Sequence, residues 1–311
     1  MTTAHGTASR LTAALMGTCV ALSAQAPSLP KAAADLTITH AAREVGPGEI
    51  VLLTISAPSP LSSVTGQAFG QPLAAFVGDT PGTWRALVGI DLGTAPSEYQ
   101  VTIDATATDG AALSGAYPLV VRPKTFGVRR LRVPQQFVTP PQSARERIER
   151  EQKRLAEVLS VVSRVRLWHG AFEEPAAGAP VSSFGVRSDY NGQKGTPHLG
   201  TDFAGATGSP VRAPNAGRVV LAADLYYSGN TVIVDHGLGL FSLLAHLSRV
   251  DVREGDLVAR GATVGAVGAT GRVTGPHLHW SVRLGRASVD PLSLLAVTSS
   301  LVPTPPRSAS P

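Results

Sequence analysis

Short apolar runs separated by glycine and proline are the feature that most constrains the fold of this chain. The 311 residues include 32 glycines and 24 prolines, and 43% are hydrophobic while 16% are charged, which is a globular composition. Turn-forming residues at this density favour short strands and loops over long helices. The length leaves room for two domains that each bury a core. We therefore predict an all-β fold.

The first predicted domain covers residues 35–124. Its apolar runs alternate in part with a period of two, as in Ile50–Ile55, Trp84–Val88 and Tyr99–Asp104, and turn residues such as Thr80-Pro81-Gly82 separate them. Strands spaced in this way are typical of a small β-sandwich. We expect a β-sandwich-like domain that acts either as a structural spacer or as a module that binds a substrate or partner.

The sequence changes character from Gln142 to about Ser163, where Arg, Glu, Gln and Lys dominate. Pro140-Pro141 precedes this stretch and forms a natural helix boundary. The apolar residues of the stretch recur at helical spacing: Ile148, Leu155, Leu159 and Val162. We predict an amphipathic helix within a linker of residues 125–167.

Short apolar runs return in residues 168–297, with glycines between them. Examples are Gly217–Leu221, Asn230–His236 and Leu278–Val282. This pattern predicts a second domain with an antiparallel β fold, tight turns and very little helix. Residues 298–311 are rich in Ser and Pro, so we expect a disordered tail there.

The first 34 residues have the pattern of an export signal. Arg10 precedes an uncharged, largely apolar stretch, Leu11–Ala24, and small residues offer cleavage after residue 26 or 34. The stretch is shorter than the about 20 residues that a membrane-spanning helix needs. Cys19, the only cysteine, lies inside it without a good lipoprotein pattern. We expect a cysteine-free mature protein with no stable membrane span, located in the periplasm or secreted.

The chain is basic, with a formal net charge of +5 and a pI of about 9.7. This charge favours polyanionic surroundings such as an acidic glycopolymer or an anionic membrane. Lys and Arg are not interleaved with aromatic residues as in a nucleic-acid groove. We therefore expect no nucleic acid partner.

Three histidine-bearing clusters lie within about eighty residues of the second domain. The first holds His198 and Asp202, the second His246, and the third His277 and His279. Residues two apart on a strand face the same side, so both imidazoles of the third cluster enter one cavity. The first and third clusters together can offer zinc two imidazoles and one carboxylate. Three protein ligands leave a position open for water, which indicates a catalytic zinc ion (Zn2+) and a hydrolase.

With these clusters, the region from about Val181 to Pro291 resembles the lysostaphin-like zinc metallopeptidases that cut peptidoglycan. The order, spacing and flanking glycines of several motifs carry the resemblance: Ser183-Phe184-Gly185, Pro197–Ala204, Gly208–Ala213, Gly229–Gly237, Ala245–Ser248 and Gly268–His279. It implies a peptidoglycan endopeptidase whose partners are the peptides of the cell wall. It says little about residues 35–165.

The resemblance implies that His198, Asp202 and His279 bind zinc and that His246 and His277 form the catalytic pair. One histidine of the pair can take a proton from water, and the other can stabilise the oxyanion or protonate the leaving amine. The sequence leaves open which histidine has which role.

One residue departs from the family pattern. Many relatives carry a tyrosine two residues before the histidine of the Ala-His-Leu segment, where this chain has Leu244. Tyr226 or Tyr227 is a candidate to supply a hydroxyl in its place.

The alternative function is a non-catalytic cell-wall-binding or hydrolase-activating protein that retains the fold. The other histidines of residues 35–311, namely His40, His169 and His236, lie outside the proposed site set, and we expect no metal role for them.

Overall fold

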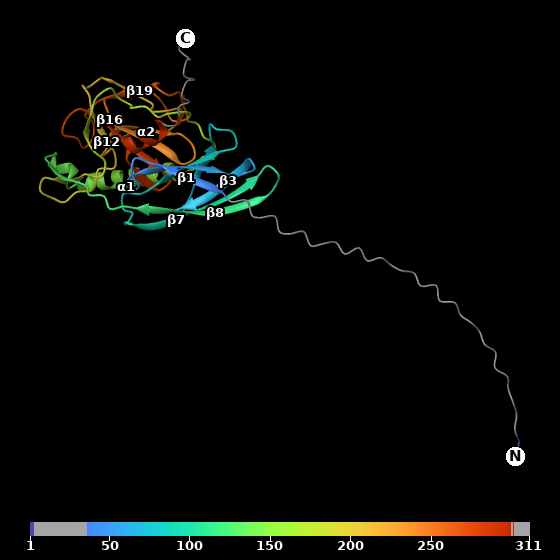
Figure 1. Cartoon of the computed structure of the whole chain (residues 1–311). Helices are drawn as coiled ribbons and strands as arrows, with labels where there is room; N and C mark the ends of the chain where they lie inside the picture. The colour runs from blue at the N-terminus through green and yellow to red at the C-terminus, as the bar shows by residue number, and fades with distance from the viewer. Residues whose placement is uncertain (3–35, 300, 302–311) are drawn as a thin grey trace, which may run out of the picture. The chain divides into compact units, whose positions relative to one another are not determined.

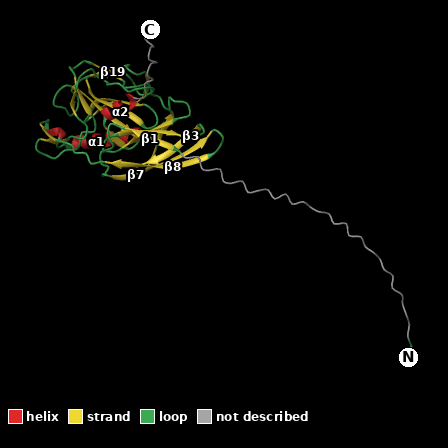
Figure 2. Ribbon diagram, in the orientation of Figure 1, coloured by secondary structure: helices red, strands yellow, loops and turns green. Residues whose placement is uncertain are grey.

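The computed structural model describes residues 1–2, 36–299 and 301 (Figure 1). The predicted export signal with Cys19, and residues 302–311 of the predicted tail, lie outside the described residues. The described residues from Leu36 onward form one compact unit. Its described part is mostly antiparallel strand with two α-helices, which confirms the predicted all-β class (Figure 2).

The N-terminal strands form two four-stranded antiparallel sheets, β1-β2-β6-β5 and β4-β3-β7-β8. Their bounds are β1 Thr37–Ala41, β2 Ile50–Ser56, β3 Leu61–Ala68, β4 Gln71–Pro72, β5 Ala74–Val77, β6 Trp84–Gly89, β7 Ser97–Ala107 and β8 Ala112–Val121. Apolar residues of both sheets share one core, including Val51 and Val88 from the first and Val101 and Ile103 from the second. The two sheets therefore pack face to face.

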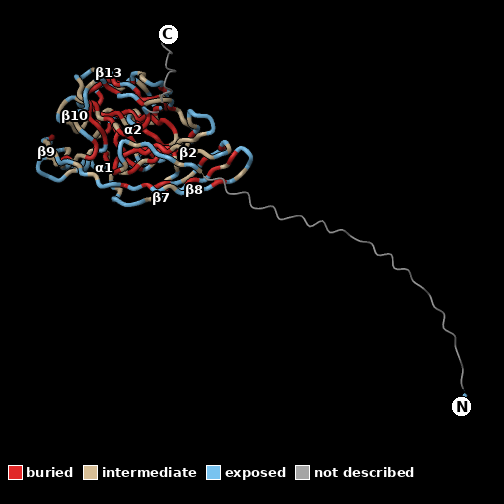
Figure 3. Tube along the Cα trace, in the orientation of Figure 1, coloured by how far each residue is buried: buried red, intermediate tan, exposed pale blue. Residues whose placement is uncertain are grey.

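Strand β2 is buried on both faces. Val51 and Leu53 contribute to the core between the two sheets, whereas Ile50 and Leu52 contribute to the core of the C-terminal part. An unbroken apolar run is what a strand covered on both sides requires. The sheet that contains β2 is thus a layer common to both cores, and Figure 3 shows the burial along the chain.

The segment between the two parts contains β9 (Val128–Leu131), the short 3-10 helix η1 (Gln135–Phe137) and α1 (Gln142–Ser160). Helix α1 begins where the sequence predicts and ends at Ser160, just before two β-branched valines. Its residues Leu155 and Leu159 pack on a buried cluster that includes Leu221 and Phe241. The helix therefore covers part of one face of the C-terminal sheet.

The C-terminal part is built on one large sheet with the order β10-β12-β20-β16-β15-β14-β18, and β21 pairs with β20. A second sheet has the order β13-β19-β17, and β11 pairs with β9 in parallel. The bounds are β10 Pro180–Ser182, β11 Arg187–Tyr190, β12 Thr201–Ala204, β13 Pro210–Arg212, β14 Gly217–Leu225, β15 Gly229–Asp235, β16 Leu240–Leu247, β17 Arg249–Val250, β18 Leu257–Val258, β19 Thr263–Ala266, β20 His277–Leu284 and β21 Ala287–Val289.

A second helix, α2 (Pro291–Ser299), closes this part and was not predicted. The domain end predicted at residue 297 falls within it, and Thr298 is fully buried. Apolar Leu294 and Val297 of α2 belong to the core that Ile50 and Leu52 join. The predicted division into domains at residues 124 and 167 stays a prediction. No helix among the described residues is both long and apolar enough to cross a membrane.

Candidate metal centre

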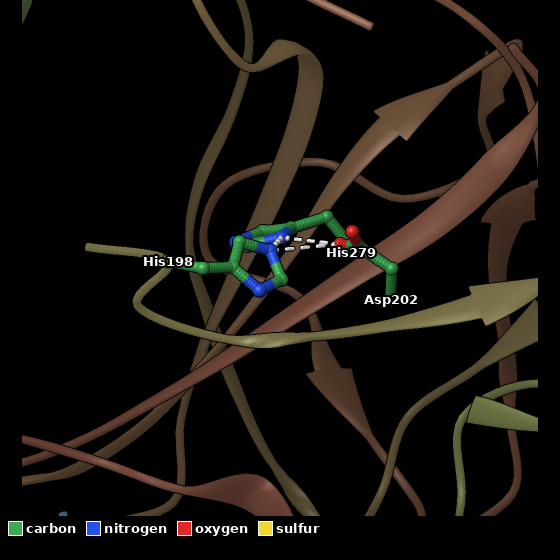
Figure 4. Close-up of side chains that lie close together, drawn as sticks. All are labelled: His198, Asp202 and His279. Carbon is green, nitrogen blue, oxygen red and sulfur yellow. Dashed lines mark hydrogen bonds and ion pairs between the residues drawn. The ribbon is translucent and has the colours of Figure 1, made fainter. Parts of the chain in front are cut away.

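Three side chains meet where β12 and β20 lie side by side in the large sheet (Figure 4). Asp202 on β12 is the register partner of His279 on β20, and His198 reaches the same point from the loop before β12. His198 Nε2, Asp202 Oδ1 and His279 Nδ1 are each 2.9 Å from the other two atoms. The structure thus brings together the three residues predicted as metal ligands.

The outer nitrogens of both imidazoles are occupied. His198 Nδ1 lies 3.2 Å from the carbonyl oxygen of Ser183, and His279 Nε2 lies 2.8 Å from Ser281 Oγ. When each outer N–H donates in these contacts, the inner nitrogens carry unshared electron pairs. Two lone pairs and a carboxylate oxygen then face one point, an arrangement that a cation stabilises.

The donor set fits a divalent metal of the zinc type. Bonds of about 2.0 to 2.1 Å place tetrahedral ligand atoms about 3.3 Å apart, so a small widening of the 2.9 Å triangle accommodates the ion. Burial alone would raise the pKa of Asp202, but its contacts with His198 and His279 hold that pKa well below its ordinary value. Burial lowers the pKa of His279. An ionised carboxylate and a neutral imidazole are the forms that bind metal.

The two remaining predicted histidines line the same cleft. This cavity has a volume of about 270 Å³, and its lining includes His198, Asp202, His246, His277 and His279. The rings of His246 and His277 are 5.0 Å apart at their centroids. His277 Nε2 lies 3.7 Å from Asp202 Oδ1, next to the three donor atoms.

Backbone carbonyls orient both of these imidazoles. Nδ1 of His246 lies 2.8 Å from the Thr270 oxygen, and Nδ1 of His277 lies 2.8 Å from the Gly275 oxygen. Each Nδ1–H therefore donates, and each Nε2 is left to accept a proton. Burial, with the nearby His279 and His277, lowers the pKa of His246 to about 3, so this imidazole is neutral near pH 7.

His246 has a backbone φ of +65°, which is rare for a residue other than glycine. Its N–H donates to the Ser228 oxygen at 2.9 Å, so the backbone is fixed by the loop before β15. Left-handed backbone at a non-glycine residue costs about 1 to 3 kcal/mol and is concentrated at functional sites.

The cleft also contains residues that the sequence analysis did not select. Arg129 of β9 donates from Nε to Ser188 Oγ at 2.8 Å and also contacts Ser182 Oγ. Its Nη1 lies 3.7 Å from Asp202 Oδ2, the carboxylate oxygen outside the donor triangle. No local pattern around Arg129 indicates this role, because β9 reaches the site only through its parallel pairing with β11.

Leu244 is fully buried in the apolar core. Of the two candidate tyrosines, Tyr227 lines the cleft, whereas the Tyr226 hydroxyl donates to the Gln136 oxygen at 2.7 Å outside it. A tyrosine side chain therefore borders the cleft even though position 244 carries leucine.

The histidines outside the predicted site are held elsewhere. His236 is fully buried between the Ala216 oxygen and Ser242 Oγ, at 2.8 and 2.9 Å. His40 contacts the Tyr117 hydroxyl, and His169 lies beside Arg166. None of the three lines the cleft.

Comparison with known proteins agrees with this geometry. Residues 196–291 match the model of the family described as Peptidase family M23. The crystal structure of a putative peptidase M23 from Pseudomonas aeruginosa is similar with a TM-score of 0.63 and 31% identity, over 83% of this chain and 96% of that one.

Curated relatives match about a third of the chain. Peptidoglycan DD-endopeptidase ShyA of Vibrio cholerae is 40% identical over 107 residues, which is 34% of this chain and 25% of that protein. DD-carboxypeptidase/endopeptidase Mpg of Neisseria meningitidis is 40% identical over 104 residues, 33% of this chain and 24% of that protein. The chain thus spans about a quarter of the length of these relatives. Since the Pseudomonas match extends over nearly all of that protein, the chain belongs to peptidase family M23, the lysostaphin-like metallopeptidases.

Proposed function

We propose that this chain is an exported zinc metalloendopeptidase that hydrolyses peptide cross-links of bacterial peptidoglycan. One observation carries the proposal: three metal-type donor atoms lie 2.9 Å apart in a cleft that also contains two further histidines. A metal site with proton-transfer groups beside it is typical of a metal-dependent hydrolase.

His198, Asp202 and His279 would hold the ion. When bound, zinc would lower the pKa of a coordinated water to about 7 and polarise the carbonyl of the scissile amide. Ser183 and Ser281 fix the two imidazole rings, and Arg129 contacts the outer carboxylate oxygen of Asp202. Such outer contacts orient metal ligands.

His246 and His277 supply the proton chemistry in this proposal. Each donates its Nδ1–H to a backbone carbonyl, so each offers Nε2 to the cleft. One imidazole would take a proton from the attacking water. The other would stabilise the oxyanion or deliver a proton to the leaving amine.

The substrate follows from the relatives and from charge. The similar Vibrio protein is named a peptidoglycan DD-endopeptidase, and the basic pI of about 9.7 favours an acidic polymer. The bonds available in such a polymer are glycine bridges and direct D-alanyl cross-links to a diamino acid. The export pattern at residues 1–34 supports action in the periplasm or outside the cell.

The test is to incubate zinc-loaded protein with purified peptidoglycan and to measure new amine ends and soluble peptides. We expect release by the wild type, loss of at least about 100-fold in His277→Ala, and no change in the matched control His169→Ala, whose side chain lies outside the cleft. Stoichiometric zinc without any release would favour the alternative, a non-catalytic wall-binding or hydrolase-activating protein. Release that persists in His277→Ala would contradict the assigned role of that residue.

A further inference from the structure

Arg272 lies in the wall of the cleft, where its side chain packs against two aromatic rings. Its guanidinium carbon is 4.5 Å from the ring centroid of Tyr190 and 4.8 Å from that of Tyr227, and all three side chains line the cavity. Within residues 36–299, its guanidinium makes neither an ion pair nor a hydrogen bond. Aromatic contact leaves the N–H donors at the rim of a guanidinium free to bind a carboxylate in two places at once.

The backbone holds Arg272 in this position. Its N–H donates to the Tyr227 oxygen at 2.8 Å. The preceding Gly271 has a φ of +76°, and a Cβ there would lie 2.5 Å from the Gly229 nitrogen. The loop therefore packs closely against residues 227–229, so the backbone of Arg272 is fixed there. Its two ring contacts hold the side chain at the cleft wall, which reduces the entropy lost on binding.

The charge of the cleft favours an anionic group at this point. The charged groups of its lining, apart from the histidines, are Arg129, Arg272 and Asp202. Asp202 already contacts two histidines and Arg129. Asp202 is the only carboxylate of the lining, and Arg129 already contacts it. Arg272 is therefore the cation in the cleft that is available to an anionic ligand.

The chemistry of the cross-link says which anion this is. The acyl residue of the cleaved amide has used its own carboxyl group in the bond, so the nearest free carboxylate lies on the amine side. A diamino acid with a carboxylate on the carbon bonded to the amide nitrogen has this group. A residue within a glycine bridge has none, because its carboxyl group forms the next amide.

We propose that Arg272, held by Tyr190 and Tyr227, binds a carboxylate on the carbon that follows the cleaved amide nitrogen. The proposal rests on the function proposed above and narrows its substrate. It selects direct cross-links to a diamino acid with such a carboxylate over glycine bridges. A chain that ends in D-alanine has the same chemistry at its terminus, so both sources must be tested.

The experiment compares three synthetic wall peptides: a direct cross-link with the free carboxylate, the same cross-link as its carboxamide, and an uncross-linked peptide ending in D-alanine. For each, kcat/KM is measured with zinc-loaded wild type, Arg272→Gln, Arg272→Lys and the matched control Arg130→Gln. Arg130 is exposed on β9 and does not line the cleft. Calorimetry with the amine-side products, as carboxylate and as carboxamide, measures binding without cleavage.

We expect the wild type and Arg130→Gln to prefer the carboxylate cross-link over the carboxamide by about 10- to 100-fold in kcat/KM, the range of a charge-assisted hydrogen-bonded pair. Arg272→Gln should lose this preference, and Arg272→Lys should keep part of it. A comparable rate on the D-alanine peptide would make the terminal carboxylate a second source of the ligand.

Two results overturn the proposal: an equal loss on both cross-links in Arg272→Gln, which indicates a purely structural role, or equal binding of the two products by the wild type. If the wild type cleaves no peptide, the proposed function fails. The product affinities still decide the role of Arg272 in that case.

Discussion

Gly200 lies between two of the proposed metal ligands, and its missing side chain lets their loop approach β20. A Cβ at this position would lie 2.7 Å from His279 Cε1 and 2.5 Å from the Trp280 oxygen. Contacts this short do not occur in folded proteins, so either the loop or the His279 ring would have to move. The glycine of the Pro197–Asp202 motif is thus a requirement of the site.

Gly200→Ala is expected to weaken zinc binding by about 10-fold or more, because displaced ligands lose the geometry that the metal needs. Zinc titration against a competing chelator measures the effect. Gly127→Ala is the matched control, since a Cβ there meets nothing within 4 Å. Equal zinc affinities for the two variants would contradict this account of Gly200.

The buried imidazole of His236 makes stability depend on pH. Burial lowers its pKa from the ordinary 6.5 to about 4. Between these values the unfolded chain binds a proton that the folded chain does not, so stability is complete above about pH 6.5 and falls as pH decreases. At about pH 5, protonation of His236 in the unfolded chain has lowered the free energy of unfolding by about 2 kcal/mol.

Urea unfolding of wild type and His236→Gln at about pH 7.5 and pH 5 tests this link. The variant is expected to be less stable at the higher pH, because two buried contacts change. On acidification, the free energy of unfolding of the variant should fall by about 2 kcal/mol less than that of the wild type. Parallel pH dependences would show that His236 does not supply the effect.

At the scale of elements, strand β9 connects the linker to the cleft. It runs parallel to β11, with Val128 opposite Arg187 and Leu131 opposite Tyr190. Asn191, with a φ of +51°, fastens the end of this pair: its side chain accepts from the Val133 nitrogen at 3.0 Å and donates to the Val133 oxygen at 2.9 Å. The linker therefore supplies part of the cleft wall.

Asn191→Gly keeps the left-handed backbone without strain. It removes the two side-chain hydrogen bonds to the Val133 backbone and the longer one to Gln135 Oε1 at 3.3 Å. At about 1 kcal/mol each, the loss of the two bonds to Val133 should make opening of β9 about 30-fold more frequent. Trypsin cleavage after Arg129, Arg130 or Arg132, followed by mass spectrometry, reports this opening. Asn191→Asp keeps only the acceptor and should give an intermediate rate, whereas unchanged cleavage in both variants would contradict the role of Asn191.

Local patterns were sufficient to predict some elements and not others. The helix at Gln142–Ser160 and the strand with His277 and His279 have clear helical or two-residue periodicity. Strand β9 could not be predicted, because four residues with two arginines become a strand only through a partner far away in the sequence. Helix α2 was missed because its short apolar sequence is buried within the core and has no amphipathic pattern.

At the scale of the whole molecule, the compact unit is held by a shared core and by buried charges. Glu49, with a side chain that is 0% exposed, binds Arg43 at 2.6 Å and Lys124 at 2.5 Å, and Arg43 also binds Asp290 beside α2 at 2.5 Å. Burial would raise the pKa of Glu49, but the hydrogen bonds from Arg43 and Lys124 hold it below its ordinary value. The network links the N-terminal sheets to the C-terminal part.

Glu49→Gln is expected to destabilise the described unit by about 2 kcal/mol, since it leaves Lys124 without a buried anion and Arg43 with Asp290 alone. The loss should appear as a shift of one cooperative unfolding transition in calorimetry, because both parts share a core. Glu44→Gln is the control: its side chain is 51% exposed and contacts Lys124 alone, so we expect less than about 1 kcal/mol. Two separate transitions, with only one of them shifted, would contradict a single folding unit.

The sequence was sufficient to predict the fold class and the five histidine and aspartate side chains that lie together in one cleft. The domain of residues 35–124 stays a prediction. Strand β2 of this part is covered on both faces, and the apolar run Ile50–Leu53, which lacks alternation, is the pattern of such a strand. The second face of that strand is covered by the C-terminal part, which is distant in the sequence, so local patterns do not show what covers it. Arg272 was inside a quoted motif, yet its two tyrosine contacts come from distant segments.

The central claim is that His198, Asp202 and His279 hold the zinc ion on which hydrolysis depends. Anomalous diffraction at the zinc edge, from crystals of the zinc-loaded protein, tests this most directly. We expect one peak bound by His198 Nε2, Asp202 Oδ1 and His279 Nδ1 at about 2.0 to 2.1 Å, and no peak in Asp202→Ala crystals. Absence of a peak from the wild type, or a peak on other side chains, would contradict the account.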